Sequence, residues 1–473
     1  MRSVRRLKDN EMTAVGCNVL MEQKRSVFSS RIGFVLAAAG SAVGLGNIWR
    51  FPYLAAKYGG GIFLLVYFVL VITFGFTLMI AEIALGRKTG LSVIGAYRSL
   101  NKKWSFLGVL SAIVPIIIVS YYCVIGGWVT KYFGDFISGF GAATASDTFF
   151  NSFVSDEWTP LIWFAVYAAL TFIVVLLGVE KGIEKASKIL MPVLLVLTLA
   201  VTIYSITLPG AGEGVAYYFY PDFSKFSIDT VLAAMGQMFY SMSLAMGIMV
   251  TYGSYMSKKE SLEKSVKQIE WFDTGVSFLA GLMIVPAVFV FSGGDEAALS
   301  TGPSLMFVTM PKVFQSMGPA GNVVGSLFFL LVLFAALTSS ISLMETVVSI
   351  FMDRFKMSRK KACFIALGII VVLAIPSSLG FGLWSDISWN GMTILDIFDF
   401  ISNSVLMPIV ALLTCIFVGY VIKPQAIIAE VELNGRFRRK RMFQVFIKYI
   451  APIILAAILI CSVLQGLGVI ASF

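Results

Sequence analysis

Two apolar stretches of the sequence are interrupted by polar residues that glycines flank. The first reads GSAVGLGNIWRFP at 40–52, and the second reads GQMFYSMSLAMG at 236–247. Glycine lowers helix stability by about 1 kcal/mol per position relative to alanine, so both clusters predict a break in a helix. A broken helix exposes N–H groups that can bind an anion and carbonyl groups that can bind a cation. The pair of breaks therefore predicts a site for a carboxylate together with a metal cation.

The first cluster by itself has two readings. Gly40 and Gly44 also fit a Gly-x-x-x-Gly face along which two helices pack, and this reading is as good as a break. The second cluster favours the break, because it lies five apolar stretches further on. An odd offset makes the two interrupted helices run in opposite directions, as in an inverted repeat with its site near the bilayer midplane.

The composition places these stretches in a membrane. The chain has 473 residues, of which 58% are hydrophobic and only 13% are charged, and it has no histidine. Soluble proteins carry about 25% charged residues, so this chain is predicted to be an integral membrane protein. The lack of histidine removes the commonest general base and metal ligand, which disfavours an enzyme. The net charge of +10 indicates basic loops and no nucleic-acid partner. The five cysteines are an odd number without paired spacing, so they are expected to be core residues.

Eleven stretches are long and apolar enough to span a bilayer, which requires about 20 residues each. They run at 32–53, 61–85, 106–133, 160–179, 187–208, 229–254, 271–293, 321–351, 361–377, 393–421 and 446–470.

The Lys and Arg residues predict the orientation, because cytoplasmic loops keep positive charge. All but five of the 36 fall on one side; the exceptions are Arg50, Lys57, Lys131, Lys225 and Lys312. The N-terminus is therefore expected in the cytoplasm and the C-terminus outside. No cleavable signal peptide and no Asn-x-Ser/Thr sequon is apparent, which favours a multi-pass protein of a bacterial inner membrane. Residues 1–20 resemble an appendage, because Met21 is a second candidate start.

Three motifs resemble the neurotransmitter:sodium symporter family, and its bacterial amino-acid members most closely. They are GxxxGLGNxWRFPY at 40–53, GQxFxSxSL at 236–244 and LTSSIS at 337–342, and the similarity runs from about Lys24 to the C-terminus. The resemblance implies an all-α membrane fold like that of the leucine transporter, with 11 transmembrane helices, two inverted five-helix repeats and unwound helices 1 and 6. The expected parts are a cytoplasmic tail (1–31), the first repeat (32–208), the second repeat (229–421) and an eleventh helix (446–473).

The resemblance also implies two sodium sites built from oxygen ligands, as a hard cation prefers. The first would use the carbonyl of Ala42 with Asn47, Ser241 and Asp273. The second would use the carbonyls of Gly40, Val43 and Ala335 with the hydroxyls of Thr338 and Ser339. Without the resemblance, Thr338, Ser339 and Ser340 fit small-residue helix packing better.

The implied substrate site binds a carboxylate at the N–H groups of Leu45 and Gly46 and at the Tyr122 hydroxyl. Its other contacts would be Ile118, Tyr240, Ser243, Met246, Ser339 and Leu343. Monoamine carriers of the family have an aspartate where this chain has Gly44, so a free amino acid is the expected substrate. The apolar wall and the adaptable Met246 favour a neutral, apolar or aromatic amino acid.

Charged and aromatic residues match the family's gates. Arg50 and Asp399 match the outer pair, with Tyr122 and Tyr240 beneath them. Arg25 and Asp353 match the inner pair, with Phe28 and Tyr255 beside them, although Asp353 alone would pass for an ordinary charge at a helix end. Glu82 matches a glutamate that hydrogen-bonds unwound backbone, and Glu345 has no assigned role.

The residues that match the chloride site of animal members are Tyr67, Gln237, Ser241, Asp273 and Ser277. A fixed carboxylate at Asp273 would repel chloride and replace its charge, so transport is expected to need sodium but not chloride. Asp273 is also the expected proton-sensitive group of the return step.

The sequence thus predicts a sodium-coupled importer of a neutral amino acid that works by alternating access, and no enzyme. A sodium-coupled carrier of another small organic solute is the alternative, and a channel is a weaker one. Its partners are the lipid bilayer and the small-molecule substrate, and the oligomeric state is left open.

Overall fold

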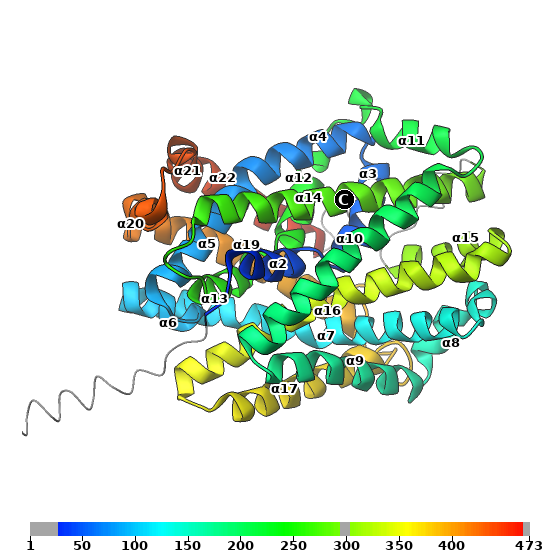
Figure 1. Ribbon diagram of the computed structural model, residues 1–473, viewed down its shortest axis with the longest axis horizontal. Coiled ribbons are helices and arrows are strands. Elements are labelled where there is room, and N and C mark those ends of the chain that lie inside the picture. Colours follow the sequence, from blue (N-terminus) through cyan, green and yellow to red (C-terminus); the bar gives the residue numbers. More distant parts are fainter. Residues whose placement is uncertain (1–26, 294–302, 467–473) are drawn as a thin grey trace, which may run out of the picture.

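The computed structural model describes residues 27–293 and 303–466. These residues are helical almost throughout; within the two ranges no β-strand forms, and only two isolated β-bridges occur. Most helices run side by side along the long axis of the molecule (Figure 1). The short helices α6 and α20 lie at one end, and α8, α11 and α15 lie at the other (Figure 1). We call the end with α6 and α20, where most of the loop Lys and Arg residues lie, the basic end.

Within the described ranges, nine helices or unbroken runs of helix are long and apolar enough to cross a membrane. Some of these runs contain short π-helical or 3-10 turns, labelled η. The nine are α4 (Gly61–Leu70) with η2 (Val71–Gly75) and α5 (Phe76–Thr89); η3 (Lys102–Trp104) with α7 (Ser105–Ile137); α9 (Thr159–Leu176); η5 (Val179–Glu184) with α10 (Lys185–Ile206); α14 (Leu262–Ser292); α16 (Pro319–Phe355); α17 (Arg359–Leu379); α18 (Ile394–Asp399) with η9 (Phe400–Leu406), α19 (Met407–Ile416) and η10 (Phe417–Val421); and α21 (Lys440–Val445) with η12 (Phe446–Ile450) and α22 (Ala451–Gly466).

Shorter elements connect these spans at the two ends of the molecule. They are α6 (Val93–Leu100), η4 (Gly141–Ala145), α8 (Phe149–Ser155), α11 (Ala211–Phe219), η6 (Phe223–Lys225), η8 (Leu305–Thr309), α15 (Met310–Ser316), α20 (Pro424–Val431) and η11 (Glu432–Asn434).

The first predicted break is present. Helix α2 (Arg31–Ala42) ends at Val43, and the chain continues as η1 (Gly46–Arg50) and α3 (Phe51–Lys57). The two halves meet at an angle of 55°, and together they are apolar enough for one span. Ser30 starts α2 by accepting a hydrogen bond from Gly33 N at 3.1 Å, which satisfies a donor of the first turn.

The second break separates α12 (Ile228–Ser241) from α13 (Ile248–Ser254). Neither half is long enough to span a bilayer by itself. Between them Ser243, Ala245 and Gly247 adopt positive φ angles of 52°, 61° and 72°. Left-handed backbone costs a residue other than glycine about 1–2 kcal/mol, so Ser243 and Ala245 are held there by the surrounding packing.

The nine continuous spans and the first interrupted one correspond to ten of the eleven predicted stretches. The sixth, 229–254, falls on α12 and α13, which are not among the described helices or helix pairs that are long and apolar enough for a span. The prediction for the seventh, 271–293, started too late, because α14 begins at Leu262. Its first turns carry Glu263, Lys264 and Lys267, and a helix keeps its backbone hydrogen bonds through a polar region outside the apolar stretch.

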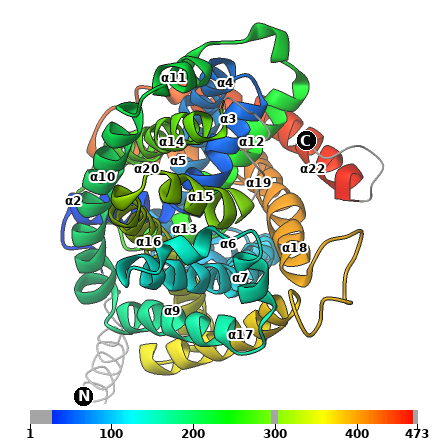
Figure 2. The same cartoon turned by 90° about the vertical axis from the view of Figure 1, so that its right-hand side faces the viewer.

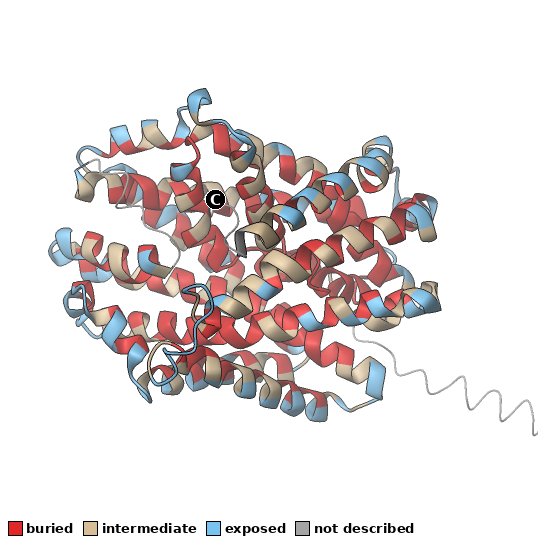
Figure 3. Ribbon diagram, turned by 180° about the vertical axis from the view of Figure 1, so that it is seen from behind, coloured by how far each residue is buried: buried red, intermediate tan, exposed pale blue. Residues whose placement is uncertain are grey.

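Helix α16 lies in the core, and four helices lie at the rim. In its most apolar window 78% of the residues of α16 are buried, compared with 22% for the run that ends in α22. Viewed from the end opposite the basic end, α9, α10, α17 and α22 surround α13 and α16 (Figure 2). Exposed residues gather at the helix ends and on the outer helices, while the centre of the bundle is buried (Figure 3). Cys123, Cys363 and Cys415 are free and buried, as predicted for core residues; Cys461 is half-buried, and Cys17 lies outside the described residues.

Candidate functional site

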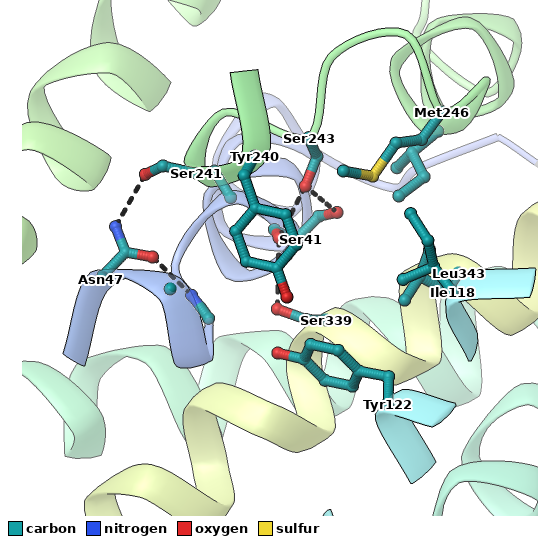
Figure 4. A pocket seen from close by; sticks show the side chains of 14 residues that line it. Ser41, Asn47, Ile118, Tyr122, Tyr240, Ser241, Ser243, Met246, Ser339 and Leu343 are labelled. Carbon is teal, nitrogen blue, oxygen red and sulfur yellow. Dashed lines mark hydrogen bonds between the residues drawn. The ribbon is translucent and has the colours of Figure 1, made fainter. Parts of the chain in front are cut away.

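A cavity lies where the two breaks meet α7 and α16. Side chains and backbone from all four segments line it: Ser41, Ala42, Gly44, Gly46, Asn47, Ile118, Tyr122, Tyr240, Ser241, Ser243, Met246, Ile248, Ser339 and Leu343. Of the ten residues predicted for the substrate site, Leu45 is the one that is not in this lining. Figure 4 shows Met246, Ile118 and Leu343 together on one side and Asn47 and Ser241 on the other, with the Tyr240 ring between them.

The cavity is small in this conformation. Its volume is about 20 Å³, which is close to the minimum that a single water molecule requires. An amino acid would fit only after side chains move, and the unbranched Met246 side chain is the most adaptable part of the wall.

Glycines at the first break allow side chains to approach the backbone closely. A Cβ at Gly44 would lie 2.7 Å from Ser339 Oγ and 2.9 Å from Tyr122 Oη. A Cβ at Gly46 would lie 2.5 Å from the Tyr240 ring. These distances are too short for real contacts, so a larger residue at either position would displace the groups that line the cavity.

The Tyr122 hydroxyl and the backbone of the first break lie together, as predicted for the carboxylate site. Leu45 N donates a hydrogen bond of 3.2 Å to Tyr122 Oη. Gly44 N donates to Asn47 Oδ1 at 2.8 Å, which fixes the amide of Asn47 within the break. A hydroxyl and helix-terminal N–H groups are the donors that a carboxylate requires.

The oxygen atoms predicted for the second sodium site lie around the hydroxyls of α16. Ser339 Oγ lies 3.4 Å from the carbonyl oxygen of Gly40, 3.2 Å from that of Ser41 and 3.3 Å from that of Val43. Thr338 Oγ1 lies 3.1 Å from the carbonyl oxygen of Ala335. Uncharged oxygen ligands of this kind suit a hard cation such as sodium.

The residues predicted for the first sodium site form a buried hydrogen-bond cluster around Asp273 of α14. Asn47 Nδ2 lies 2.8 Å from Asp273 Oδ1 and 2.9 Å from Ser241 Oγ. Ser241 Oγ also donates to Asp273 Oδ1 at 2.6 Å, and the Asp273 side chain is fully buried. Within the described residues, no three Asp, Glu or Cys side chains gather as a transition-metal site would require.

The residues that match the chloride site surround the same carboxylate. Tyr67 Oη donates to Asp273 Oδ2 at 3.2 Å, and Ser277 Oγ lies 2.7 Å from Asn47 Nδ2. Gln237 instead donates from Nε2 to the Gly46 carbonyl at 3.0 Å, and its buried Oε1 has no hydrogen-bond partner. Asp273 therefore contributes a carboxylate to the polar cluster in which the family resemblance places chloride.

A wide vestibule adjoins the cavity on the side away from the basic end. It has a volume of about 410 Å³, and Tyr240 lines both it and the central cavity. Arg50 and Asp399, the predicted outer pair, both line this vestibule, yet no ion pair joins these two described residues. Asp399 Oδ1 instead accepts hydrogen bonds from Tyr121 Oη at 3.0 Å and from Asn403 Nδ2 at 2.6 Å.

The opposite side of the cavity is closed by aromatic packing. The Phe28 ring contacts Phe34, Tyr252 and Tyr255 at centroid distances of 5.7, 5.6 and 6.2 Å. Phe28 N also donates to the Tyr255 carbonyl at 3.0 Å. Of the predicted inner pair, Arg25 lies outside the described residues, and Asp353 Oδ2 accepts a hydrogen bond of 2.6 Å from Ser92 N, just before α6.

Two further buried glutamates contact the second break or the end of α13. Glu82 Oε1 accepts a hydrogen bond of 2.8 Å from Ala245 N in the second break, which confirms its predicted contact with unwound backbone. Glu345, for which the sequence indicates no role, forms an ion pair with Arg359 and accepts a hydrogen bond of 2.8 Å from Tyr255 Oη.

The sequence prediction omitted four residues at the site: Ser41, Tyr121, Ile248 and Asn403. Ser41 and Ile248 line the cavity, and Ser243 Oγ donates to the Ser41 carbonyl at 2.8 Å. Tyr121 and Asn403 hold Asp399. The spacing of Asn403 from Asp399, four residues apart on one helical face, is the signal that could have found it.

The helical membrane fold, with a cavity at two interrupted helices, is that of a membrane transporter. A family model described as the sodium:neurotransmitter symporter family matches residues 25–151 and 157–468. The chain belongs to this family, which confirms the predicted family and fold and the prediction of a transporter as opposed to an enzyme.

Relatives and a solved structure agree with this assignment. The chain is 36% identical over 442 residues to an uncharacterized sodium-dependent transporter, YhdH, of Bacillus subtilis, covering 92% of this chain and 97% of that protein. It is 32% identical over 458 residues to an uncharacterized sodium-dependent transporter of Haemophilus influenzae, covering 93% and 98%. The crystal structure of MhsT in complex with L-phenylalanine matches with a TM-score of 0.84 and 39% identity, covering 93% of this chain and 100% of that one.

Proposed function

We propose that this protein is a sodium-coupled symporter that imports a neutral, apolar or aromatic amino acid by alternating access. One observation carries the proposal: a single cavity joins unwound backbone and a tyrosine hydroxyl, which suit a carboxylate, with an apolar wall of Ile118, Met246 and Leu343. The L-phenylalanine complex of MhsT supports the same substrate class.

Sodium is the coupling ion in this proposal, at two sites. The first comprises Ala42, Asn47, Ser241 and Asp273, and the second comprises Gly40, Val43, Ala335, Thr338 and Ser339. Ser241 Oγ lies 2.6 Å from Asp273 Oδ1, and Ser339 Oγ lies within 3.4 Å of the Gly40 and Val43 carbonyl oxygens, which supports these assignments. Asn47 directs its Nδ2 to Asp273, so its amide would have to turn to offer Oδ1 to an ion. A substrate carboxylate bound at the N–H groups of Leu45 and Gly46 would lie beside the first site, which explains why the ion and the amino acid would move together.

We further propose that transport does not require chloride. Asp273 contributes a buried carboxylate among Tyr67, Ser241 and Asn47, where a bound chloride would meet a like charge. The carboxylate would balance the charge of the first sodium ion in place of chloride.

The proposed orientation puts the basic end in the cytoplasm of a bacterial inner membrane, with the C-terminus outside. The vestibule between Arg50 and Asp399 then faces outward, while Phe28 and Tyr255 close the inner side. Closure of the outer pair above Tyr122 and Tyr240, followed by opening near Arg25 and Asp353, would complete import. Residues 32–208 and 229–421 would be the two inverted repeats that move relative to one another, with 1–31 as a tail and 446–473 as an additional helix.

Uptake into proteoliposomes tests the proposal. A labelled aromatic amino acid should accumulate against its gradient when sodium is outside, but not with potassium, and unlabelled apolar amino acids should compete. Replacing chloride with gluconate should leave the rate unchanged. If none of the twenty amino acids competes in the presence of sodium, the amino-acid proposal is wrong, and a strict chloride requirement would reject the role of Asp273.

The same assay separates the alternatives. Sodium-driven accumulation of a different small organic solute would support the alternative carrier function. A channel cannot concentrate its solute, so saturable uptake against a gradient would exclude that function.

A further inference from the structure

At the basic end of the molecule, the side chain of Glu184 reaches from the start of α10 to the residues that precede α2. Glu184 is the last residue of η5, and it is only 1% exposed. Its carboxylate accepts hydrogen bonds from Ser29 N at 2.7 Å and Ser29 Oγ at 2.5 Å, and from Ser30 Oγ at 3.2 Å. One carboxylate therefore binds both residues ahead of the first interrupted helix.

The contact is built into the helix terminus itself. Ser30 is the N-cap of α2, and its hydroxyl accepts from Gly33 N while it donates to Glu184. A negative charge beside a helix N-terminus is stabilised by the helix dipole. A Cβ at Gly33 would overlap Glu184 Oε1, so glycine at this position is what allows the carboxylate to lie against the first turn.

Lys188 balances the charge of Glu184 without contributing to this link. Its Nζ lies 2.7 Å from Glu184 Oε1, and the lysine side chain is 40% exposed. Because Lys188 lies one turn further along the same helix, its ion pair does not connect α10 to α2. The three hydrogen bonds from Ser29 and Ser30 form the connection.

The linked segment is the one that closes the cavity toward the basic end. Phe28, the residue before Ser29, packs against Tyr252 and Tyr255 and donates its N–H to the Tyr255 carbonyl. Two neighbouring residues thus attach the start of α2 to two different helices, Phe28 to α13 and Ser29 to α10. Any opening of this end that moves α2 away from α10 must break the bonds to Glu184.

We propose that Glu184 is a positioning residue for transport: it holds the start of α2 against α10 while the cavity is closed to the basic end, and it releases α2 when that end opens. Glu184 does not line the central cavity, so it acts through α2 and touches neither substrate nor the proposed ions. This inference rests on the alternating access proposed above. It assigns to the Glu184 carboxylate the stabilisation of the state that is closed at the basic end.

The hydrogen bonds to Glu184 favour the closed state over the opened state, but they do not prevent opening. When α2 moves away, water can replace the serine donors, so only the net gain of the bonds is lost. A hydrogen bond to a charged acceptor contributes more net free energy than a bond between neutral groups. Removing the charge should therefore increase the population of the opened state by about tenfold, which is the change expected from losing one such bond.

Hydrogen–deuterium exchange of the full-length protein in detergent, with sodium and without any amino acid, tests the proposal. The variants are Glu184→Gln, Ser29→Ala and the matched control Glu180→Gln, which changes an exposed glutamate of the same turn. In Glu184→Gln, peptides covering residues 28–42 should exchange about tenfold faster, while those of α17 should not change. Ser29→Ala should show a smaller increase, and Glu180→Gln should match the unmodified protein.

A second measurement distinguishes positioning from a purely structural role. The oxygens of the second proposed sodium site lie together in this conformation, which is closed at the basic end, so sodium should favour it. Glu184→Gln should therefore need a higher sodium concentration for half-maximal uptake than Glu180→Gln. Unchanged exchange at 28–42, faster exchange throughout the molecule, or an equal effect of Glu180→Gln would overturn the proposal. If Glu184→Gln does not fold, Ser29→Ala carries the same comparison.

The exchange experiment uses no substrate, so its result is independent of the substrate class. Local acceleration at 28–42 with no amino-acid uptake would reject the proposed substrate and retain the role of Glu184. Normal amino-acid uptake with unchanged exchange would retain the proposed substrate and reject the role of Glu184.

Discussion

Tyr121 Oη donates a hydrogen bond of 3.0 Å to Asp399 Oδ1, and this bond holds the carboxylate on the wall of the vestibule. Arg50 lines the same vestibule and forms no ion pair with Asp399, although both residues are described. Both hydrogen bonds to Asp399 end on Oδ1, so Oδ2 is available to Arg50, and the bond from Tyr121 fixes where the carboxylate lies. Loss of the tyrosine hydroxyl should therefore let the carboxylate move toward the arginine.

Substitution of Tyr121 by Phe should favour the closed vestibule. The variant loses one hydrogen bond to a charged acceptor, worth roughly 1.5–3 kcal/mol, so a shift toward closure of about tenfold or more is expected. Cys461 lines the vestibule and provides the readout. In a background with Cys17→Ser, labelling of Cys461 by a membrane-impermeant thiol reagent should slow by that factor. Ser404→Ala, another change in the vestibule lining, should leave the rate unaltered; equal rates for Tyr121→Phe and the parent would contradict the prediction.

Removal of the buried charge at Asp273 should create a chloride dependence. With Asp273→Asn the polar cluster keeps Tyr67, Ser241 and Ser277 but loses its fixed anion, so a chloride ion would no longer be repelled. Uptake by this variant should be at least about fivefold faster in chloride than in gluconate, a difference of about 1 kcal/mol. Glu270→Gln, which removes a carboxylate one turn earlier on α14, should remain insensitive to the anion. Equal, fast uptake by Asp273→Asn in both buffers would show that no anion is needed there.

The hydroxyl of Ser339 should set the sodium requirement. Ser339→Ala removes a side-chain oxygen that lies 3.4 Å from the Gly40 carbonyl oxygen and 3.3 Å from that of Val43. The sodium concentration for half-maximal uptake should rise by about five- to tenfold, as expected for losing one ligand worth about 1 kcal/mol. Ser326→Ala, on the same helix, removes only a hydroxyl bonded to the Asn322 carbonyl and serves as the control. Sodium curves that superimpose for Ser339→Ala and the parent would remove Ser339 from the proposed ion site.

An added methyl group at Gly46 should block the cavity without unfolding the protein. The new Cβ would lie 2.5 Å from the Tyr240 ring, and overpacking of this kind costs about 1–3 kcal/mol. Substrate affinity should fall by roughly 5- to 150-fold, measured by binding to the purified protein. At Gly368 of α17 a Cβ meets nothing within 4 Å, so Gly368→Ala should bind normally and be slightly more stable to heat. Normal binding by Gly46→Ala would mean that the Tyr240 ring does not close over the site.

The helical spans and both breaks could be predicted from the sequence, because apolar length and glycine clusters act locally. The sequence indicated buried carboxylates at Glu82 and Asp273, but it did not reveal which charges at the basic end are buried. It places Arg87 in a basic loop, yet Arg87 is 2% exposed and forms an ion pair of 2.8 Å with Glu430, which lies 343 positions away. Glu184 and Glu270 are likewise buried at the basic end. Such pairings depend on the tertiary fold and leave no local pattern.

The site illustrates the same limit. Asn47, Ser241 and Ser339 belong to motifs that stand out in the sequence, and the structure brings them to one cavity. Tyr121 differs from its neighbour Tyr122 only in the direction of its side chain, which depends on how α7 is rotated against α18 and η9. Ser41 contributes its backbone carbonyl, a group that every residue has, so its position in the sequence gives no signal.

The left-handed residues of the second break connect the stability of the fold to the contents of the cavity. Ser243 and Ala245 adopt positive φ angles, which are unfavourable for residues with a side chain. Hydrogen bonds to Glu82 and to the Ser41 carbonyl stabilise this conformation. A ligand that contacts this segment would add to those bonds, and its affinity for the folded protein would then set how far occupancy raises the melting temperature. Glycine at position 245 would adopt this backbone conformation without strain. The protein without ligand would then depend less on bound ligand for its resistance to heat.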